Sequence, residues 1–247
     1  MKRSFGIIGV ACSLLALVAA VVWQIFFSEQ VNYYITSVAV LVLSMLPFFV
    51  GFELKKISTG EITLVATFIA LAVVSRAVFY LIPQFKPIGA VVIIAAVCLG
   101  AQRGYLVGSF SAFISNFIFG QGFWTPFQMV ALGLVGFLSG LIFKKINPKR
   151  VSLSIVGFVL CFALYGLIVD MSTIISVYAN DFDFKGAMSI YLTGLPFSAV
   201  FGAATAVFLF LFGESFIKKT HRVIKKYGLI CTQDKNNAEK LYENIEK

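Results

Sequence analysis

Two charged residues, Arg76 and Asp170, lie inside long apolar stretches of the sequence. A charge inside a membrane-spanning helix costs about 2.5–3.5 kcal/mol on insertion-based scales, which makes each of them a candidate functional residue. Both are expected about 9–12 Å below the outer surface, because they precede the outer ends of their segments by about six and eight residues at 1.5 Å rise per residue. They could form an ion pair that only fixes helix packing, or they could face a substrate cavity open to the outside.

Uncharged polar and aromatic side chains gather at the same predicted depth. Two connections, Pro83–Pro87 and Gly120–Trp124, would lie above them as candidate lids, the first stiffened by prolines and the second freed by glycines. Apolar walls with a few convergent polar groups are typical of small-molecule sites. We therefore predict a substrate site that contains Arg76, Tyr80, Phe85, Lys86, Asn116, Gln121, Trp124, Gln128, Asp170 and Thr173.

The elements that must position these residues are apolar helices. The 247 residues are 60% hydrophobic and 13% charged, far from the roughly 45–50% and 25% of soluble domains. Apolar runs of about 20 residues without period-two alternation predict spanning helices. We expect an all-α polytopic membrane protein with about eight transmembrane helices: Phe5–Phe27, Tyr33–Phe52, Ile62–Ile82, Ile88–Ala101, Tyr105–Phe119, Phe127–Phe143, Val151–Tyr178 and Gly186–Phe212.

The basic residues predict the orientation of these helices. Most Lys and Arg residues fall on one side when both termini are cytoplasmic, as the positive-inside rule requires. The net charge of +9 therefore indicates topology in a cell membrane rather than binding to nucleic acid. We divide the chain into two additional N-terminal helices (1–55), a six-helix substrate-binding core (56–217) and a basic cytoplasmic tail (218–247).

Motifs for catalysis and metal binding are missing from the sequence. It has no GxxxxGK[ST] phosphate loop, no Gly-x-Ser-x-Gly and no HExxH. The single histidine and the spacing of the four cysteines match no metal site or disulfide framework. We therefore expect a transport component with no cofactor rather than an enzyme, driven by another protein or by a gradient.

Small residues at four-residue spacing mark helix faces that other helices can approach closely. Ala66 and Ala70 form one such face, and Gly136 and Gly140 form another. Either face could dock a partner protein or pack internally. Arg76 lies about 100° around its helix from the alanine face, so one helix could dock a partner and also line a pocket.

These residues resemble the substrate-binding S components of energy-coupling-factor (ECF) vitamin transporters. The segment Ala66-Thr67-Phe68-Ile69-Ala70 is similar to the family's AxxxA motif. A longer run is similar to the cobalamin or cobalamin-precursor subgroup; it comprises Arg76, Pro83-Gln84-Phe85-Lys86-Pro87, Ser115-Asn116-Phe117, Gly120-Gln121-Gly122 and Trp124-Thr125-Pro126. The two extra N-terminal helices and the charged tail depart from the family pattern.

The resemblance implies a six-helix core that binds a vitamin-like substrate in its outer half, gated by the two loops. It also implies a shared transmembrane coupling subunit that contacts Ala66 and Ala70, and two separate cytoplasmic ATPase subunits. The subgroup points first to cobalamin or its lower-ligand precursor, with a pyridoxine-like compound also possible. Two other classes stay open: a self-contained secondary transporter that uses Arg76 and Asp170, and a membrane enzyme or regulatory scaffold.

Overall fold

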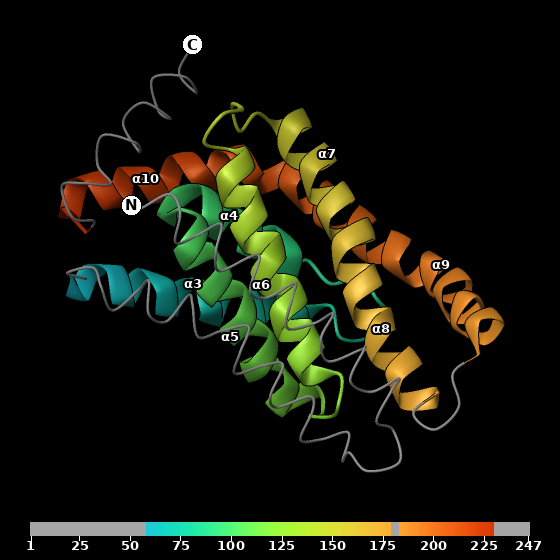
Figure 1. Cartoon of the computed structure of the whole chain (residues 1–247). Helices are drawn as coiled ribbons and strands as arrows, with labels where there is room; N and C mark the ends of the chain where they lie inside the picture. Colours follow the sequence, from blue (N-terminus) through green and yellow to red (C-terminus); the bar gives the residue numbers. More distant parts are fainter. Residues whose placement is uncertain (1–57, 179–182, 230–247) are drawn as a thin grey trace, which may run out of the picture.

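The computed structural model describes residues 58–178 and 183–229 as helices joined by short connections (Figure 1). Within these residues there is no strand, and the helices form six continuous rods. Four rods are single helices, and two contain a π-helical turn. In chain order they are α3 (Thr59–Val78), α4 (Ile88–Leu99), α5 (Ala101–Phe119), α6 (Thr125–Ile142), α7–η1–α8 (Arg150–Val159, Leu160–Tyr165, Gly166–Val177) and α9–η2–α10 (Phe184–Phe208, Leu209–Gly213, Glu214–Tyr227).

The all-α prediction is confirmed, but eight spanning helices are not supported. The first two predicted segments, Phe5–Phe27 and Tyr33–Phe52, lie outside the described residues. Of the described helices, four are long and apolar enough to cross a membrane. They are Thr59–Val78, Thr125–Ile142, Arg150–Val177 and Phe184–Tyr227.

Helix α4 is the buried centre of the fold rather than an independent span. Its 12 residues rise about 18 Å, well short of the roughly 30 Å hydrocarbon core. Every residue of α4 except Val91 is buried, as expected of a helix that is hydrophobic all round. It contacts α3, α5, α6 and α10. Gly100, at φ 93°, ends α4 and turns the chain directly into α5. Helix α4 is therefore shorter than the predicted segment Ile88–Ala101.

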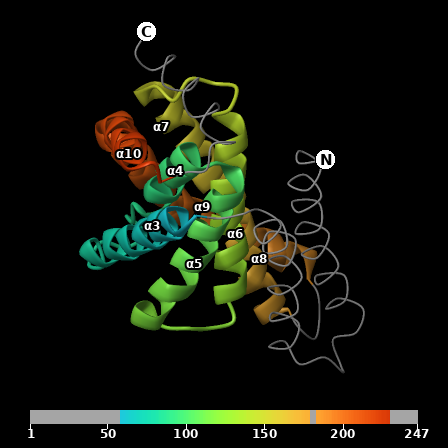
Figure 2. The same cartoon turned by 90° about the vertical axis from the view of Figure 1, so that its left-hand side faces the viewer.

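Helices α5 and α6 lie side by side in both views (Figures 1 and 2). A Cβ atom on Gly108 would collide with the backbone of Leu132, and one on Gly136 would collide with the backbone of Gly104. A Cβ atom on Gly140 would likewise collide with the backbone of Ala101. The predicted face of Gly136 and Gly140 is therefore an internal packing surface, where missing side chains let two helix backbones touch.

The last rod is longer than predicted. Its apolar part was expected to end at Phe212, yet the helix continues through η2 to Tyr227 and contains Pro196 in its first half. Helix α10 runs beside α3 in the opposite direction: Phe216 contacts Phe68 edge to face, and Ser58 donates a hydrogen bond to the carbonyl of Leu229 at 3.0 Å. Contacts with α4, together with those to Phe68 and Ser58, hold the helix beyond the apolar stretch.

A buried ion pair joins α3 to α5 at the end where α3 begins. Arg103 Nη2 lies 3.0 Å from Glu61 Oε2, and the two side chains are 8% and 1% exposed. Arg103 Nη1 also donates to the carbonyl of Leu99 at 2.6 Å. The predicted segments Ile88–Ala101 and Tyr105–Phe119 leave Arg103 in the connection between two helices. That placement was wrong, because α5 already begins at Ala101 and carries Arg103 into the core.

Candidate functional site

Arg76 anchors a polar network where α3 and α5 end and α6 begins. Its Nη1 atom donates to Ser115 Oγ at 2.5 Å and to Asn116 Oδ1 at 2.8 Å, both on α5. Its guanidinium carbon stands 4.7 Å from the ring centroid of Phe119, one helical turn beyond Ser115. Two neutral acceptors and an aromatic face thus stabilise the charge of Arg76. These contacts stabilise the charge more strongly in a low-dielectric site than they would in water.

Asn116 is the centre of the network. Its side chain is fully buried and accepts from Arg76 while its Nδ2 donates to Thr125 Oγ1 at 3.1 Å and to Gln128 Oε1 at 2.9 Å. These three bonds reach α3 and the first turn of α6 from one α5 side chain. A buried amide with this many partners fixes the relative positions of three helices.

Thr125 ties the connection between α5 and α6 to the same network. Its hydroxyl donates to Gln121 Oε1 at 2.9 Å and accepts from the backbone N–H of Gly122 at 3.2 Å. Gln121 Nε2 in turn donates to the carbonyl of Phe113 at 3.1 Å. Gly120, at φ 101°, makes the sharp exit from α5 that brings Gln121 back over the helix end. We call Arg76, Ser115, Asn116, Gln121, Thr125 and Gln128 the Arg76 network.

The connection between α3 and α4 is fastened by aromatic contacts. The Phe85 ring lies 5.7 Å from Phe79 and 6.3 Å from Phe208, and Phe79 and Phe208 are 5.2 Å apart. The preceding residue, Gln84, has φ 55°, which costs a non-glycine residue about 1–3 kcal/mol. Strain of this kind is characteristic of ligand clamps, and the aromatic contacts offset it here.

Two more predicted residues, Tyr80 and Trp124, lie around the network, and among the described residues their side chains make no hydrogen bond to it. Tyr80 stacks on Phe119 at 5.2 Å and is 62% exposed. Trp124 packs against Phe123 at 4.9 Å and is 36% exposed. Both rings therefore flank the end of α5 that carries Asn116, within reach of a ligand that approaches the network from the surface.

Asp170 and Thr173 lie elsewhere, on α8. Asp170 faces Gly194 on α9, and among the described residues it has no ion pair with Arg76. Of the two alternatives, the ion pair of Arg76 with Asp170 does not form among the described residues, where Ser115 and Asn116 accept from the guanidinium instead. Thr173 is exposed.

Sequence reasoning missed several residues that complete the site. Ser115 is a second acceptor for Arg76, and Phe119 is the ring beneath it. Spacing offered a signal for both, because Ser115 adjoins Asn116 and Phe119 lies one turn further along the same helix. Phe79 and Phe208 gave no signal, because the sequence does not distinguish a functional aromatic residue in an apolar helix from one that only packs in the core. An apolar hollow lined by Ser154, Ala206, Val207, Phe210 and Leu211 contains none of the predicted site residues.

Comparison with protein families decides the class of protein. Residues 56–217 match the model of the ECF-type riboflavin transporter, S component. The chain belongs to this family. No curated protein and no solved structure gave a significant match. The match spans every described helix from α3 to η2 and extends into α10.

Membership confirms the coarser predictions. This S component is a multi-pass membrane protein with a substrate-binding role in transport, and it is not an enzyme. The resemblance to ECF S components is confirmed, whereas its cobalamin-like subgroup is not, because the matching family is described as riboflavin-type.

Proposed function

We propose that this S component binds riboflavin, or a closely related flavin, beside the Arg76 network and the loop from Phe79 to Pro87. The description of the family supports riboflavin as the substrate, and the Arg76 network supports this location for the binding site. The observation that carries the proposal is Asn116, a buried amide that joins Arg76 on α3 to Thr125 and Gln128 on α6. Such a hub fixes several polar groups around one small volume.

The chemistry of a flavin suits these residues. Its tricyclic ring is flat and aromatic and carries two carbonyl acceptors, while its ribityl chain carries hydroxyl groups. Phe79, Phe85 and Phe208 offer aromatic faces, and Arg76 offers directed donors. Phe85 packs against the other two rings, so a ligand that stacks there replaces contacts made by Phe85. We infer that ligand entry moves the Phe79–Pro87 loop.

The test is a fluorescence titration of riboflavin with the purified full-length protein in detergent. Saturable quenching with one site per chain supports the proposal, and competition with cobalamin and with its lower-ligand precursor tests the substrate first suggested by sequence. If cobalamin or its precursor displaces bound riboflavin when present at a lower concentration than riboflavin, that competitor replaces flavin as the proposed substrate.

An uptake assay distinguishes a secondary transporter from an ECF component. We propose that transport requires the shared coupling subunit and two ATPase subunits, with both termini of this chain in the cytoplasm. The purified chain alone in proteoliposomes should then accumulate no flavin when an ion gradient is imposed. Robust gradient-driven accumulation would support the secondary transporter instead.

The coupling subunit is expected to dock on α3. Ala66 and Ala70 are exposed on this helix, on a face that also exposes Ile62 and Val74. Ala70→Trp should block association with the coupling subunit and abolish uptake, because the indole prevents close helix approach, while flavin affinity of the isolated protein changes less than about twofold. Co-purification with the coupling subunit measures the association.

Ala203→Trp is the matched control, because Ala203 is an exposed alanine on α9. It should leave association and uptake intact. Equal loss of ligand binding and association in Ala70→Trp would show that the face supports the fold of this chain and not a partner.

The two N-terminal segments are proposed to be accessory to binding, since the Arg76 network lies wholly within residues 76–128. Deleting residues 1–55 should leave riboflavin affinity within about threefold of the full chain, provided that gel filtration shows a monodisperse protein. A monodisperse truncated protein that no longer quenches riboflavin would place part of the site in the deleted segment.

A further inference from the structure

A hollow of about 300 Å³ lies on the surface between the α7–η1–α8 rod and the α9–η2–α10 rod. Its walls are Ser154 of α7, Ala206 and Val207 of α9, and Phe210 and Leu211 of η2. The Ser154 hydroxyl is within hydrogen-bond distance of the carbonyls of Arg150 and Ala206, at 2.9 and 3.0 Å. Val207, Phe210 and Leu211 are exposed. The hollow therefore offers an apolar surface to the hydrocarbon around these two rods.

Charged side chains adjoin the hollow at the end where α7 begins. Arg150 precedes Ser154 by one helical turn, and Glu214 follows Phe210 by one turn, so each lies over one wall. The two meet, with Arg150 Nε 3.5 Å from Glu214 Oε2, and Arg150 stays 57% exposed. Lys218 Nζ lies 2.9 Å from Glu214 Oε1. An exposed guanidinium thus stands one turn from an apolar hollow.

The length of the α7–η1–α8 rod places these two features in the bilayer. Its 28 residues, Arg150–Val177, rise about 42 Å, close to the roughly 40–45 Å of a bilayer with its headgroup regions. Arg150 is the first residue of this rod and so lies at the level of the headgroups. Ser154 lies about 6 Å further in, at the edge of the hydrocarbon. A phospholipid has its phosphate and the start of its acyl chains at these same two depths.

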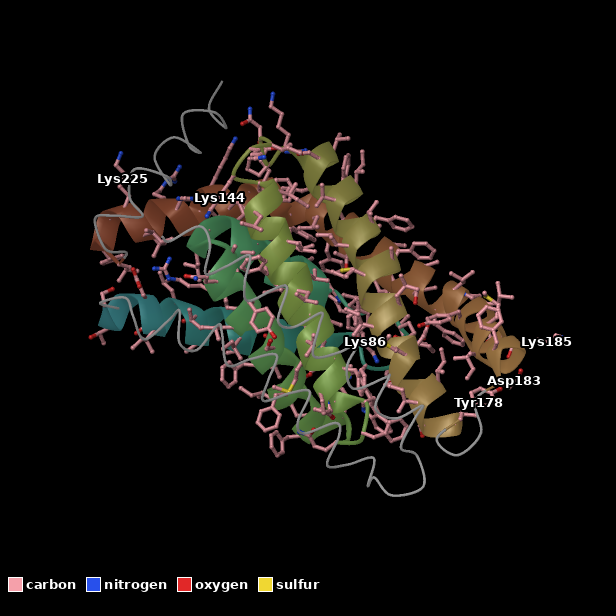
Figure 3. All side chains as sticks on the ribbon, in the orientation of Figure 1. Lys86, Lys144, Tyr178, Asp183, Lys185 and Lys225 are labelled. Atoms are coloured by element: carbon pink, nitrogen blue, oxygen red, sulfur yellow. The ribbon has the colours of Figure 1, made fainter. Side chains whose placement is uncertain are left out.

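Basic residues predominate on the two segments that meet at Arg150 and Glu214. The stretch 143–150 contains Lys144, Lys145, Lys149 and Arg150, all exposed, and the stretch 214–227 contains Lys218, Lys219, Arg222, Lys225 and Lys226 against one acid, Glu214. Figure 3 shows Lys144 and Lys225 on the α10 side of the molecule, whereas Lys86 of the predicted substrate site lies among the helices. Each basic residue near a membrane surface attracts anionic lipid by about 1 kcal/mol. This charge favours an anionic headgroup over a zwitterionic one.

We propose that one anionic phospholipid binds between the two rods, with its phosphate against Arg150 and part of one acyl chain in the hollow. An apolar cleft that ends at a basic cluster matches a phospholipid in both of its parts. The site uses no residue of the Arg76 network and none of the α3 face around Ala70. It therefore goes beyond the proposed function and does not depend on which substrate the protein carries.

The experiment titrates two lipids with identical acyl chains, phosphatidylglycerol and phosphatidylcholine, into the full-length protein in detergent. Native mass spectrometry counts the lipids bound to each chain. The wild type should retain one phosphatidylglycerol with at least about tenfold higher affinity than phosphatidylcholine. Arg150→Gln should remove this preference, and Arg150→Lys should keep it. Lys185→Gln, at an exposed lysine where α9 begins, is the control that should behave as wild type.

Glu214→Gln separates a lipid site from an ion pair that only joins helices. It removes the carboxylate shared by Arg150 and Lys218, and this carboxylate repels a phosphate. Affinity for phosphatidylglycerol should therefore rise in Glu214→Gln and fall in Arg150→Gln. Equal losses in both variants would show that the pair is structural and would overturn the proposal.

Val207→Trp tests the hollow itself, because the indole fills the space that the acyl chain would occupy. It should weaken phosphatidylglycerol binding at least about tenfold. Val200→Trp, at an exposed valine of α9 that does not line the hollow, should bind as wild type. Gel filtration and circular dichroism show whether each variant is monodisperse and helical. Unchanged binding in a folded Val207→Trp, or an equal loss in Val200→Trp, would overturn the site.

Two further outcomes of the wild-type titration decide the occupant. Equal affinity for the two lipids would overturn the proposal and leave this face to a protein partner. Displacement of phosphatidylglycerol by an equal concentration of glycerol phosphate would show a site for a free phosphate and not for a lipid. Retention of phosphatidylglycerol in the presence of excess glycerol phosphate supports the lipid site, since the acyl chain then contributes to binding.

Discussion

Arg76→Lys is expected to weaken flavin binding at least about tenfold, or roughly 1.4 kcal/mol. A lysine keeps the positive charge, but it replaces a planar fork by a single point donor. It can retain one of the bonds to Ser115 and Asn116, and it loses the other directed donors of the guanidinium. The thermal stability of the protein without ligand should change by at most about 1.5–3 kcal/mol, which is the contribution of one hydrogen bond made by a charged group.

Asn116→Leu provides the comparison for Arg76→Lys. It removes the bonds from Asn116 to Arg76, Thr125 and Gln128, so it should lower both stability and affinity. The contrast separates a residue that touches ligand from one that positions others. If Arg76→Lys destabilises the protein clearly and leaves flavin affinity unchanged, Arg76 is a packing residue and the site lies elsewhere.

Glu61→Ala is expected to have the largest effect on stability, about 3–5 kcal/mol. It leaves the buried guanidinium of Arg103 without this carboxylate, while the bond to the carbonyl of Leu99 remains. Arg103→Ala should cost a similar amount, and the double variant should be milder than either single variant. Chemical or thermal unfolding in detergent measures all three.

Lys218→Ala is the matched control for the ion pair. Lys218 pairs with Glu214 at 2.9 Å within one helix, but the two side chains are 43% and 24% exposed. An exposed pair of this kind contributes at most about 1 kcal/mol. Equal destabilisation by Lys218→Ala and Glu61→Ala would mean that burial does not set the strength of the Glu61–Arg103 pair.

The general class of the fold could be predicted from apolar runs, because hydrocarbon permits only helices or closed barrels. The number and the length of the helices could not be predicted from these runs. Gly100 ends α4 after 12 residues, and α10 extends the last helix through contacts with α4 and with Phe68 of α3, which no local pattern encodes. The Glu61–Arg103 pair was missed for the same reason, since its partners are 42 positions apart.

The polar residues of the candidate site could be predicted from the sequence, but which of them bond to one another could not. An arginine in an apolar segment and an amide at the same depth indicated a polar site, and the structure joins Arg76 to Asn116 directly. Formal charge favoured Asp170 as the partner of Arg76, but the direction of the α8 side chains decided otherwise. Asp170 points toward α9, where Gly194 leaves room for it.

The central claim is that this chain is a flavin-binding S component. Its most direct test is purification of the full-length protein from its native host, followed by mass spectrometry of the bound small molecule and the co-purifying subunits. The account predicts a bound flavin together with one membrane coupling subunit and two ATPase subunits. A different bound metabolite would contradict the substrate, and a pure chain that carries ligand and transports it without ATPase subunits would contradict the assignment as an ECF component.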